Sequence, residues 1–187
     1  MEMDSLDQEK SALRAEVRAR IPRAGSPAQV AASVAAQERL ASSDLAARAG
    51  VVGLYRALPT ECGTAALAAA LQAAGKEICY PVVGDGRALS FRRGAGVFVS
   101  GSLGVEEPTG APVALDEIDL LVVPAIAVDP RGRRLGRGKG HYDATLLASR
   151  AFSVALVFEA QLVPSVPVGE HDRPVSAVCT EARLIIV

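Results

Sequence analysis

The chain has 187 residues, half of them hydrophobic but only 4% aromatic and none tryptophan, which predicts a single globular domain over residues 1–187 with an aliphatic core. A formal net charge of −1 argues against nonspecific binding to nucleic acid. Three cysteines without the spacing of a disulfide framework or a zinc site predict reduced, partly buried thiols.

The N-terminal part of the chain is predicted to be helical. Its acidic start lacks the apolar segment of a secretory signal, and no uncharged apolar run reaches the roughly 18 residues of a membrane span, so we expect a cytoplasmic protein without a membrane partner. Residues 10–21 have apolar side chains four residues apart, which indicates an amphipathic helix. Caps predict further helices over residues 26–40 and 42–50. The first helix also carries a stripe of cations, Lys10, Arg14 and Arg18.

Strand and helix patterns alternate through the rest of the chain. Residues 84–112 are predicted to be irregular, with a turn at 104–108, and Pro124 predicts a bulge or a strand end. The alternation favours an α/β protein with a mostly parallel sheet and helices on both faces. The expected strands are 51–55, 77–83, 89–92, 97–100, 119–128, 154–158, 175–178 and 184–187, and the expected helices are 64–74 and 141–150.

Residues 131–143, RGRRLGRGKGHYD, concentrate positive charge and glycine between a strand and a helix. Crowded cations repel one another, and glycines lose much backbone entropy on folding, so their combination predicts a loop wrapped around a polyanion such as phosphate. A solvated basic turn is the alternative. The cations are Arg131, Arg133, Arg134, Arg137 and Lys139.

Two common phosphate motifs fail in this stretch. The pattern G-x-x-x-x-G-K-[ST] fails because Arg133 stands at its first glycine and Gly140 follows Lys139. The pattern G-x-G-x-x-G fails by one residue, because the glycines stand at 136, 138 and 140. Glu159 does lie about twenty residues after this loop, where dinucleotide-binding domains have an acidic residue. A dinucleotide-dependent oxidoreductase therefore remains an alternative.

A loop that relies on side-chain cations remains. Arg134, Arg137 and Lys139 are suited to neutralise a triphosphate, with glycine N–H groups between them. A triphosphate carried with Mg²⁺ also needs carboxylates. The candidates are Asp143, and Asp172 at the end of what reads as another βα segment.

The sequence resembles the 5-formyltetrahydrofolate cyclo-ligase family, also called 5,10-methenyltetrahydrofolate synthetase. Residues 123–146, VPAIAVDPRGRRLGRGKGHYDATL, are similar to the family signature VPG-x-AFD-x-x-G-x-RLGxGxGYYD-x-x-L. Further matches follow the family's order along nearly the whole chain. They are Lys10 and Arg14 to K-x-x-x-R, Glu61 and Thr64 to E-x-x-T, residues 104–108 to G-I-x-E-P, and Gln161, Pro167, Glu170 and Asp172 to Q…P…E-x-D.

The resemblance implies a three-layer α/β/α domain and a reaction. Members use ATP and Mg²⁺ to convert 5-formyltetrahydrofolate to 5,10-methenyltetrahydrofolate, releasing ADP and phosphate. Small molecules are thus the implied partners, nucleic acid is not, and we expect a monomer.

By position, the resemblance implies three sets of contacts and a catalytic role for Arg137 and Lys139. The implied nucleotide contacts are Lys10, Arg14, Arg134, Leu135, Gly136, Arg137, Gly138, Lys139, Gly140, His141 and Tyr142. The implied folate contacts are Arg56, Glu61, Arg137, Gly138, Lys139, Gly140 and His141. The implied magnesium ligands are Asp143 and Asp172.

Three positions depart from the family pattern. Ala125 replaces a glycine, which predicts a changed φ, and His141 replaces the first tyrosine of YYD. Arg56, with no tryptophan in the middle segment, alters a usually apolar folate side. A nucleotide- or folate-binding module without catalysis is therefore a further alternative to the enzyme.

Overall fold

The computed structural model describes residues 2–84, 86–94, 98–100 and 106–187. Three helices precede the first strand: α1 (Glu2–Arg20), α2 (Pro27–Ala41) and α3 (Asp44–Arg48). Helix α1 begins earlier than predicted, because the acidic N-terminal residues continue the same helix. The predicted cap of α2 is confirmed, since the Ser26 hydroxyl accepts a hydrogen bond from the Gln29 N–H at 3.2 Å. Ser43 caps α3 in the same way.

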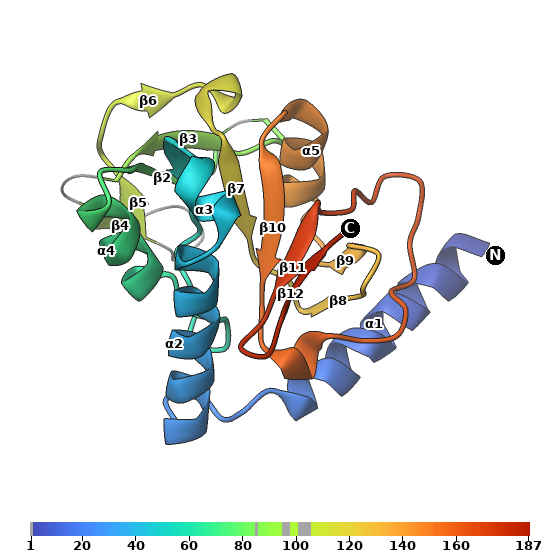
Figure 1. The fold of residues 1–187 in the computed structure, drawn as a ribbon. Helices are drawn as coiled ribbons and strands as arrows, with labels where there is room; N and C mark the ends of the chain where they lie inside the picture. The colour runs from blue at the N-terminus through green and yellow to red at the C-terminus, as the bar shows by residue number, and fades with distance from the viewer. Residues whose placement is uncertain (1, 85, 95–97, 101–105) are drawn as a thin grey trace.

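One eight-stranded sheet forms the centre of the molecule (Figure 1). Its strand order is β12-β11-β10-β7-β1-β2-β3-β6. The five central strands run parallel, and β12, β3 and β6 add antiparallel edges. The mostly parallel sheet is therefore confirmed. The strands are β1 (Val51–Gly53), β2 (Glu77–Val82), β3 (Ser90–Arg93), β6 (Pro112–Val113), β7 (Leu120–Val123), β10 (Phe152–Leu156), β11 (Ala177–Cys179) and β12 (Leu184–Ile186).

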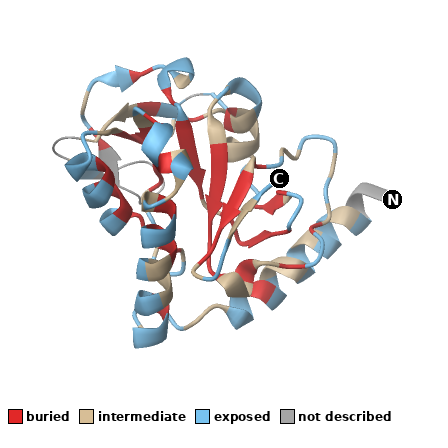
Figure 2. Ribbon diagram, in the orientation of Figure 1, coloured by how far each residue is buried: buried red, intermediate tan, exposed pale blue. Residues whose placement is uncertain are grey.

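Helices cover both faces of this sheet, as the three-layer prediction requires (Figures 1 and 2). On one face Val52, Leu120 and Leu156 pack with residues of α2, α3 and α4 (Ala65–Ala73). On the other face the alternate residues, such as Leu121 and Ala155, pack with α5 (His141–Ala148). Successive strand side chains point to opposite faces, so a continuous apolar strand supplies both cores.

The apolar run over residues 119–128 is not one strand. Strand β7 ends at Val123, directly before Pro124, as predicted from the missing N–H of proline. The chain then forms a separate hairpin of β8 (Ala127–Val128) and β9 (Arg134–Leu135). Helix α1 packs on this hairpin through a third apolar cluster that includes Val17. Within the described residues, no helix combines the length and apolar character needed to cross a membrane.

The predicted turn at residues 104–108 is wrong for its second half. Strand β5 (Glu106–Pro108) pairs antiparallel with β4 (Phe98–Ser100), because extended backbone at these acidic residues finds ladder partners. The rest of that predicted turn, residues 104 and 105, lies outside the described residues. The remaining short elements are the 3₁₀ turns η1 (Leu115–Glu117) and η2 (Glu159–Gln161).

Candidate active site

A cleft of about 820 Å³ opens where β1, β2 and β7 end at their carboxyl edge. Ligands collect at this edge of parallel sheets because the loops that follow the strands meet there. Residues of α1 and of the segment that connects β9 to α5 both line it. Every residue implied for the site lines this cleft: Lys10, Arg14, Arg56, Glu61, Arg134, Leu135, Gly136, Arg137, Gly138, Lys139, Gly140, His141, Tyr142, Asp143 and Asp172.

The glycine-rich stretch divides into two parts with different surroundings. Its first part closes the β8–β9 hairpin, where the Arg133 Nε lies 2.6 Å from the buried Asp129 carboxylate. Arg131 and Arg133 are not among the residues of the cleft, so three of the five predicted cations remain for a ligand there. The cleft is lined by the second part, residues 134–144.

Residues 136–140 form a loop between β9 and α5 that needs its glycines. Gly138 and Gly140 have φ of 93° and 71°, a region that side chains with a Cβ rarely adopt. Gly140 occupies the N-cap position of α5, and no side chain caps the helix. The unpaired N–H groups of a helix start favour an anion, so this loop has the features predicted for a phosphate site.

Arg134 is the buried cation of the cleft. Its Nη2 donates to Asp143 Oδ1 at 2.9 Å, its guanidinium lies 5.7 Å from the Tyr142 ring centre, and its Nε has no partner among the described residues. Asp143 Oδ1 also accepts from the Arg173 N–H at 3.3 Å. Burial raises the pKa of Tyr142 above its ordinary value, so its hydroxyl is protonated near neutral pH. The Arg134–Asp143 pair is thus held in place by the Tyr142 ring beside Arg134 and by the Arg173 N–H that donates to Asp143.

Helix α1 is tied to the loops by two of its predicted cations. Lys10 Nζ lies 2.5 Å from Asp172 Oδ2, and Arg14 Nε donates to the Gly136 carbonyl at 2.9 Å. Asp172 also accepts from the Gly169 N–H at 2.6 Å. The βα context predicted for Asp172 is wrong: residues 162–176 contain no helix and lead directly into β11. Asp172 reaches the cleft through a loop, which local periodicity does not reveal.

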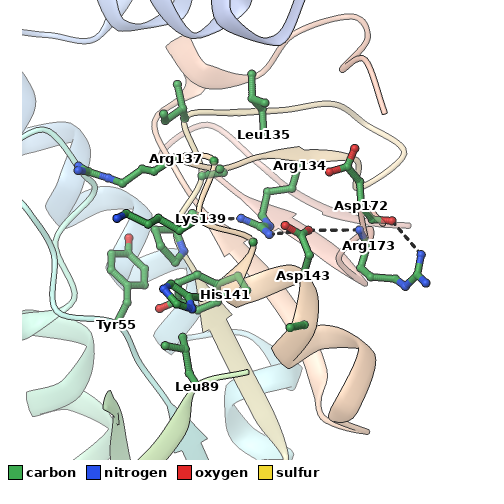
Figure 3. Close-up of a pocket in the computed structure, with 18 of the residues that line it drawn as sticks. Tyr55, Leu89, Arg134, Leu135, Arg137, Lys139, His141, Asp143, Asp172 and Arg173 are labelled. Carbon is green, nitrogen blue, oxygen red and sulfur yellow. Dashed lines mark hydrogen bonds and ion pairs between the residues drawn. The ribbon is translucent and has the colours of Figure 1, made fainter. Parts of the chain in front are cut away.

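Arg137 and Lys139 extend from the glycine loop away from the group of Arg134, Asp143 and Arg173 (Figure 3). Arg137 Nε lies 3.2 Å from Glu61 Oε1, across the cleft. The other oxygen of Glu61 accepts from the Leu58 N–H at 2.9 Å. The structure therefore pairs the candidate nucleotide cation Arg137 with the candidate folate carboxylate.

The positions that depart from the family pattern are accommodated locally. Ala125 has no positive φ, and its carbonyl accepts from the buried Gln161 side chain at 2.7 Å. His141 Nδ1 lies 2.9 Å from the Arg87 carbonyl oxygen, which can only accept, so the ring donates from Nδ1. Arg56 stacks 4.4 Å from the Phe98 ring centre. Phe98 does not line the cleft, whereas Arg56 does, so the residue presented on this side is a cation held by an aromatic ring.

The cleft also has residues that sequence reasoning missed. Arg18 continues the α1 stripe of Lys10 and Arg14, and that spacing was the available signal. Arg87 and Arg173 also line the cleft, but they come from irregular segments with no spacing that marks them. Glu159, considered for a dinucleotide ribose, instead accepts a hydrogen bond from Thr180 at 2.6 Å and is not a cleft residue.

Asp143 and Asp172 fit a magnesium ion only together with a ligand. The described residues contain no group of three or more side chains that would hold a metal by themselves. Each carboxylate uses one oxygen for the hydrogen bonds described above, which leaves its second oxygen to face a metal. Mg²⁺ is commonly held by one or two carboxylates, substrate phosphates and water, so this donor set suits it.

Comparisons with known proteins confirm the resemblance found in the sequence and the α/β fold. The model of the 5-formyltetrahydrofolate cyclo-ligase family matches residues 6–181. The chain is 34% identical over 143 residues to the 5-formyltetrahydrofolate cyclo-ligase of Mycolicibacterium smegmatis, covering 71% of this chain and 74% of the relative. It is 31% identical over 147 residues to the Escherichia coli protein of that name, covering 73% and 80%. The NMR structure of Aquifex aeolicus 5,10-methenyltetrahydrofolate synthetase superposes with a TM-score of 0.84 at 27% identity, covering 95% of this chain and 92% of the other.

Proposed function

Because the chain belongs to the 5-formyltetrahydrofolate cyclo-ligase family and is thus a ligase of folate metabolism, we propose that it converts 5-formyltetrahydrofolate to 5,10-methenyltetrahydrofolate with ATP and Mg²⁺. ADP and phosphate are the other products. We also propose that the chain acts as a single-domain, cytoplasmic monomer whose partners are these small molecules.

The proposed chemistry solves a leaving-group problem. A formamide oxygen leaves poorly, so the formyl oxygen attacks the γ-phosphorus of ATP, the bond to the ADP oxygen breaks, and a phosphorylated iminium-like carbon results. The folate N10 then attacks this carbon, loses its proton, and phosphate departs with the former formyl oxygen. Positioning and charge stabilisation supply most of the catalysis in phosphoryl transfer.

The observation that supports this proposal is that cations of α1, cations of the glycine loop and Glu61 line the same cleft. In the proposed arrangement Lys10, Arg14 and residues 134–142 contact the nucleotide. Glu61, Arg56 and residues 137–141 contact the folate, with the Glu61 carboxylate accepting from paired pterin N–H groups. Arg137 and Lys139, shared by both sets, neutralise the charge of the transferred phosphoryl group.

Asp143 and Asp172 are the residues proposed to hold Mg²⁺, which when bound would offset the negative charge of the phosphates. This assignment uses the carboxylate oxygens left free by Arg134 and Lys10. Both aspartates lie on the same side of the glycine loop as Arg134, and away from Arg137 and Lys139 (Figure 3).

A direct assay tests the proposal. Purified protein given ATP, Mg²⁺ and 5-formyltetrahydrofolate should develop the near-ultraviolet absorbance of the methenyl product and release ADP in equal amount. Binding of ATP without any absorbance rise would instead support the non-catalytic binding module. Tight binding of NAD with none of ATP would support the oxidoreductase.

A further inference from the structure

We propose that the Glu61–Arg137 ion pair couples the binding of the two substrates, because whichever ligand binds first releases the residue that the other ligand uses. The inference rests on the proposed function, in which Glu61 contacts the pterin and Arg137, although shared by both ligand sets, neutralises the phosphoryl group that ATP brings. It adds a thermodynamic link between the two halves of the cleft that the assignment of contacts alone does not contain.

The two members of the pair differ in how firmly they are held. Glu61 is mostly buried, with 13% of its side chain exposed, and its Oε2 is fixed by the Leu58 N–H at 2.9 Å. Its Oε1 is the atom that faces Arg137 at 3.2 Å. Half of the Arg137 side chain is exposed, at 50%. The carboxylate is therefore a fixed acceptor, and the guanidinium is the partner that moves.

The backbone around Arg137 suits such a movement. Gly136 precedes it and Gly138 follows it, and Gly138 has a φ of 93°. Among the described residues, the Arg137 side chain has no hydrogen bond besides the one to Glu61. The loop backbone is held separately, because Arg14 donates to the carbonyl of the neighbouring Gly136. Breaking the contact with Glu61 thus frees the whole side chain without disturbing the loop.

The Arg134–Asp143 pair in the same cleft provides a contrast. Only 2% of the Arg134 side chain is exposed, and Asp143 is also bound by the Arg173 N–H. Separating that pair would leave a buried guanidinium without its counter-ion. Of these two pairs of the glycine loop, the Glu61–Arg137 pair is therefore the one that ligands can exchange.

A simple cycle gives the size of the effect. Either ligand binding alone must break the ion pair, and so loses its free energy, whereas two ligands binding together break it only once. The coupling factor is therefore the stability of the pair itself, and it is the same in both directions. A partly exposed pair corresponds to a coupling of roughly two- to fivefold.

Calorimetric titration with the non-hydrolysable analogue AMP-PNP and Mg²⁺ measures this coupling. In the wild-type protein, saturating 5-formyltetrahydrofolate should tighten AMP-PNP binding roughly two- to fivefold. Glu61→Gln keeps an acceptor for Leu58 but removes the ion pair, so AMP-PNP alone should bind tighter by that factor. In the Arg137→Gln background, Glu61→Gln should add no such gain.

Asp7→Asn is the matched control, because Asp7 also lines the cleft and its replacement removes one negative charge while leaving the Glu61–Arg137 pair intact. It should keep the wild-type coupling. The inference is overturned if both ligands bind the wild type with a coupling factor of one, or if Asp7→Asn tightens AMP-PNP binding as much as Glu61→Gln. Failure of the wild type to bind either ligand would overturn the proposed function, and this inference with it.

Discussion

Lys139 is an exposed cation of the cleft that makes no ion pair among the described residues, whereas Lys10 is held by Asp172. Lys139 is therefore free to contact a phosphate without leaving a protein partner. Lys139→Ala should weaken AMP-PNP binding roughly ten- to hundredfold, the range for a lost hydrogen bond to a charged group. Folate affinity should fall by much less than nucleotide affinity, and the urea midpoint should change little. Equal losses of nucleotide and folate affinity would contradict the assigned role.

Asp143 stabilises the fold through its ion pair with Arg134, in addition to its proposed metal contact. Asp143→Asn leaves the buried Arg134 guanidinium with a neutral partner. Because 21% of the Asp143 side chain is exposed, the lost free energy of unfolding should be smaller than for a fully buried pair. We expect a decrease of about 2–3 kcal/mol in the free energy of unfolding without ligands, measured by urea denaturation. Asp172→Asn, whose partner Lys10 is less buried, is the control and should lose less than half as much. Equal losses would argue that burial of Arg134 is unimportant.

At the scale of elements, the hairpin of β8 and β9 presents Arg134 to the cleft, and Gly132 lets that hairpin fit. A Cβ at Gly132, whose φ is 74°, would lie 2.3 Å from the Val175 carbonyl oxygen. Gly25 has nearly the same φ of 75° but open space around it, so it isolates the cost of the backbone conformation alone. Gly25→Ala should lower the free energy of unfolding by about 1–2 kcal/mol.

Gly132→Ala should lose at least about 2 kcal/mol more than Gly25→Ala, because its Cβ also displaces the segment before β11 and breaks the hydrogen bond from the Val175 N–H to the Gly132 carbonyl. Urea denaturation of both variants measures the difference. Similar midpoints for the two variants would show that the hairpin is not packed against this segment as described.

Elements that rest on local signals could be predicted from the sequence, and those that rest on distant partners could not. The caps at Ser26 and Ser43 and the strand end before Pro124 are set by neighbouring residues. The β8–β9 hairpin depends instead on the buried Asp129 carboxylate, which accepts from the backbone N–H groups of Arg131 and Val166. No periodicity encodes such a contact, so the sequence pattern predicts one continuous strand and a loop where the hairpin stands.

The same distinction holds for the site. The spacing of glycines and cations in residues 131–143 predicted a phosphate loop, and the motif matches named the other residues that line the cleft. The division of that stretch, with Arg133 turned to Asp129 and Arg137 turned to Glu61, follows from tertiary contacts. The sequence pattern does not predict Arg87 and Arg173 as site residues, because only the folded loops bring them to the cleft.

At the scale of the whole molecule, the three cysteines are buried and free, so the predicted reduced thiols are confirmed and lie deeper than expected. Burial raises the pKa of Cys62, Cys79 and Cys179 from 9.0 to about 12 each. Between these values the unfolded chain loses the thiol protons while the folded chain keeps them. The folded state therefore binds more protons there, and its stability falls as the pH rises.

The free energy of unfolding should accordingly change little from pH 7 to about 8 and then fall, most steeply between about pH 10 and 11, by up to about 1.4 kcal/mol per pH unit for each thiol. Burial raises the pKa of Tyr55 as well, which adds to the decline at the upper end. Urea midpoints across this range measure the slope, and Cys79→Ala should make it shallower because one titrating group is gone. An unchanged slope in that variant would mean that Cys79 is no more protected in the folded chain than in the unfolded one.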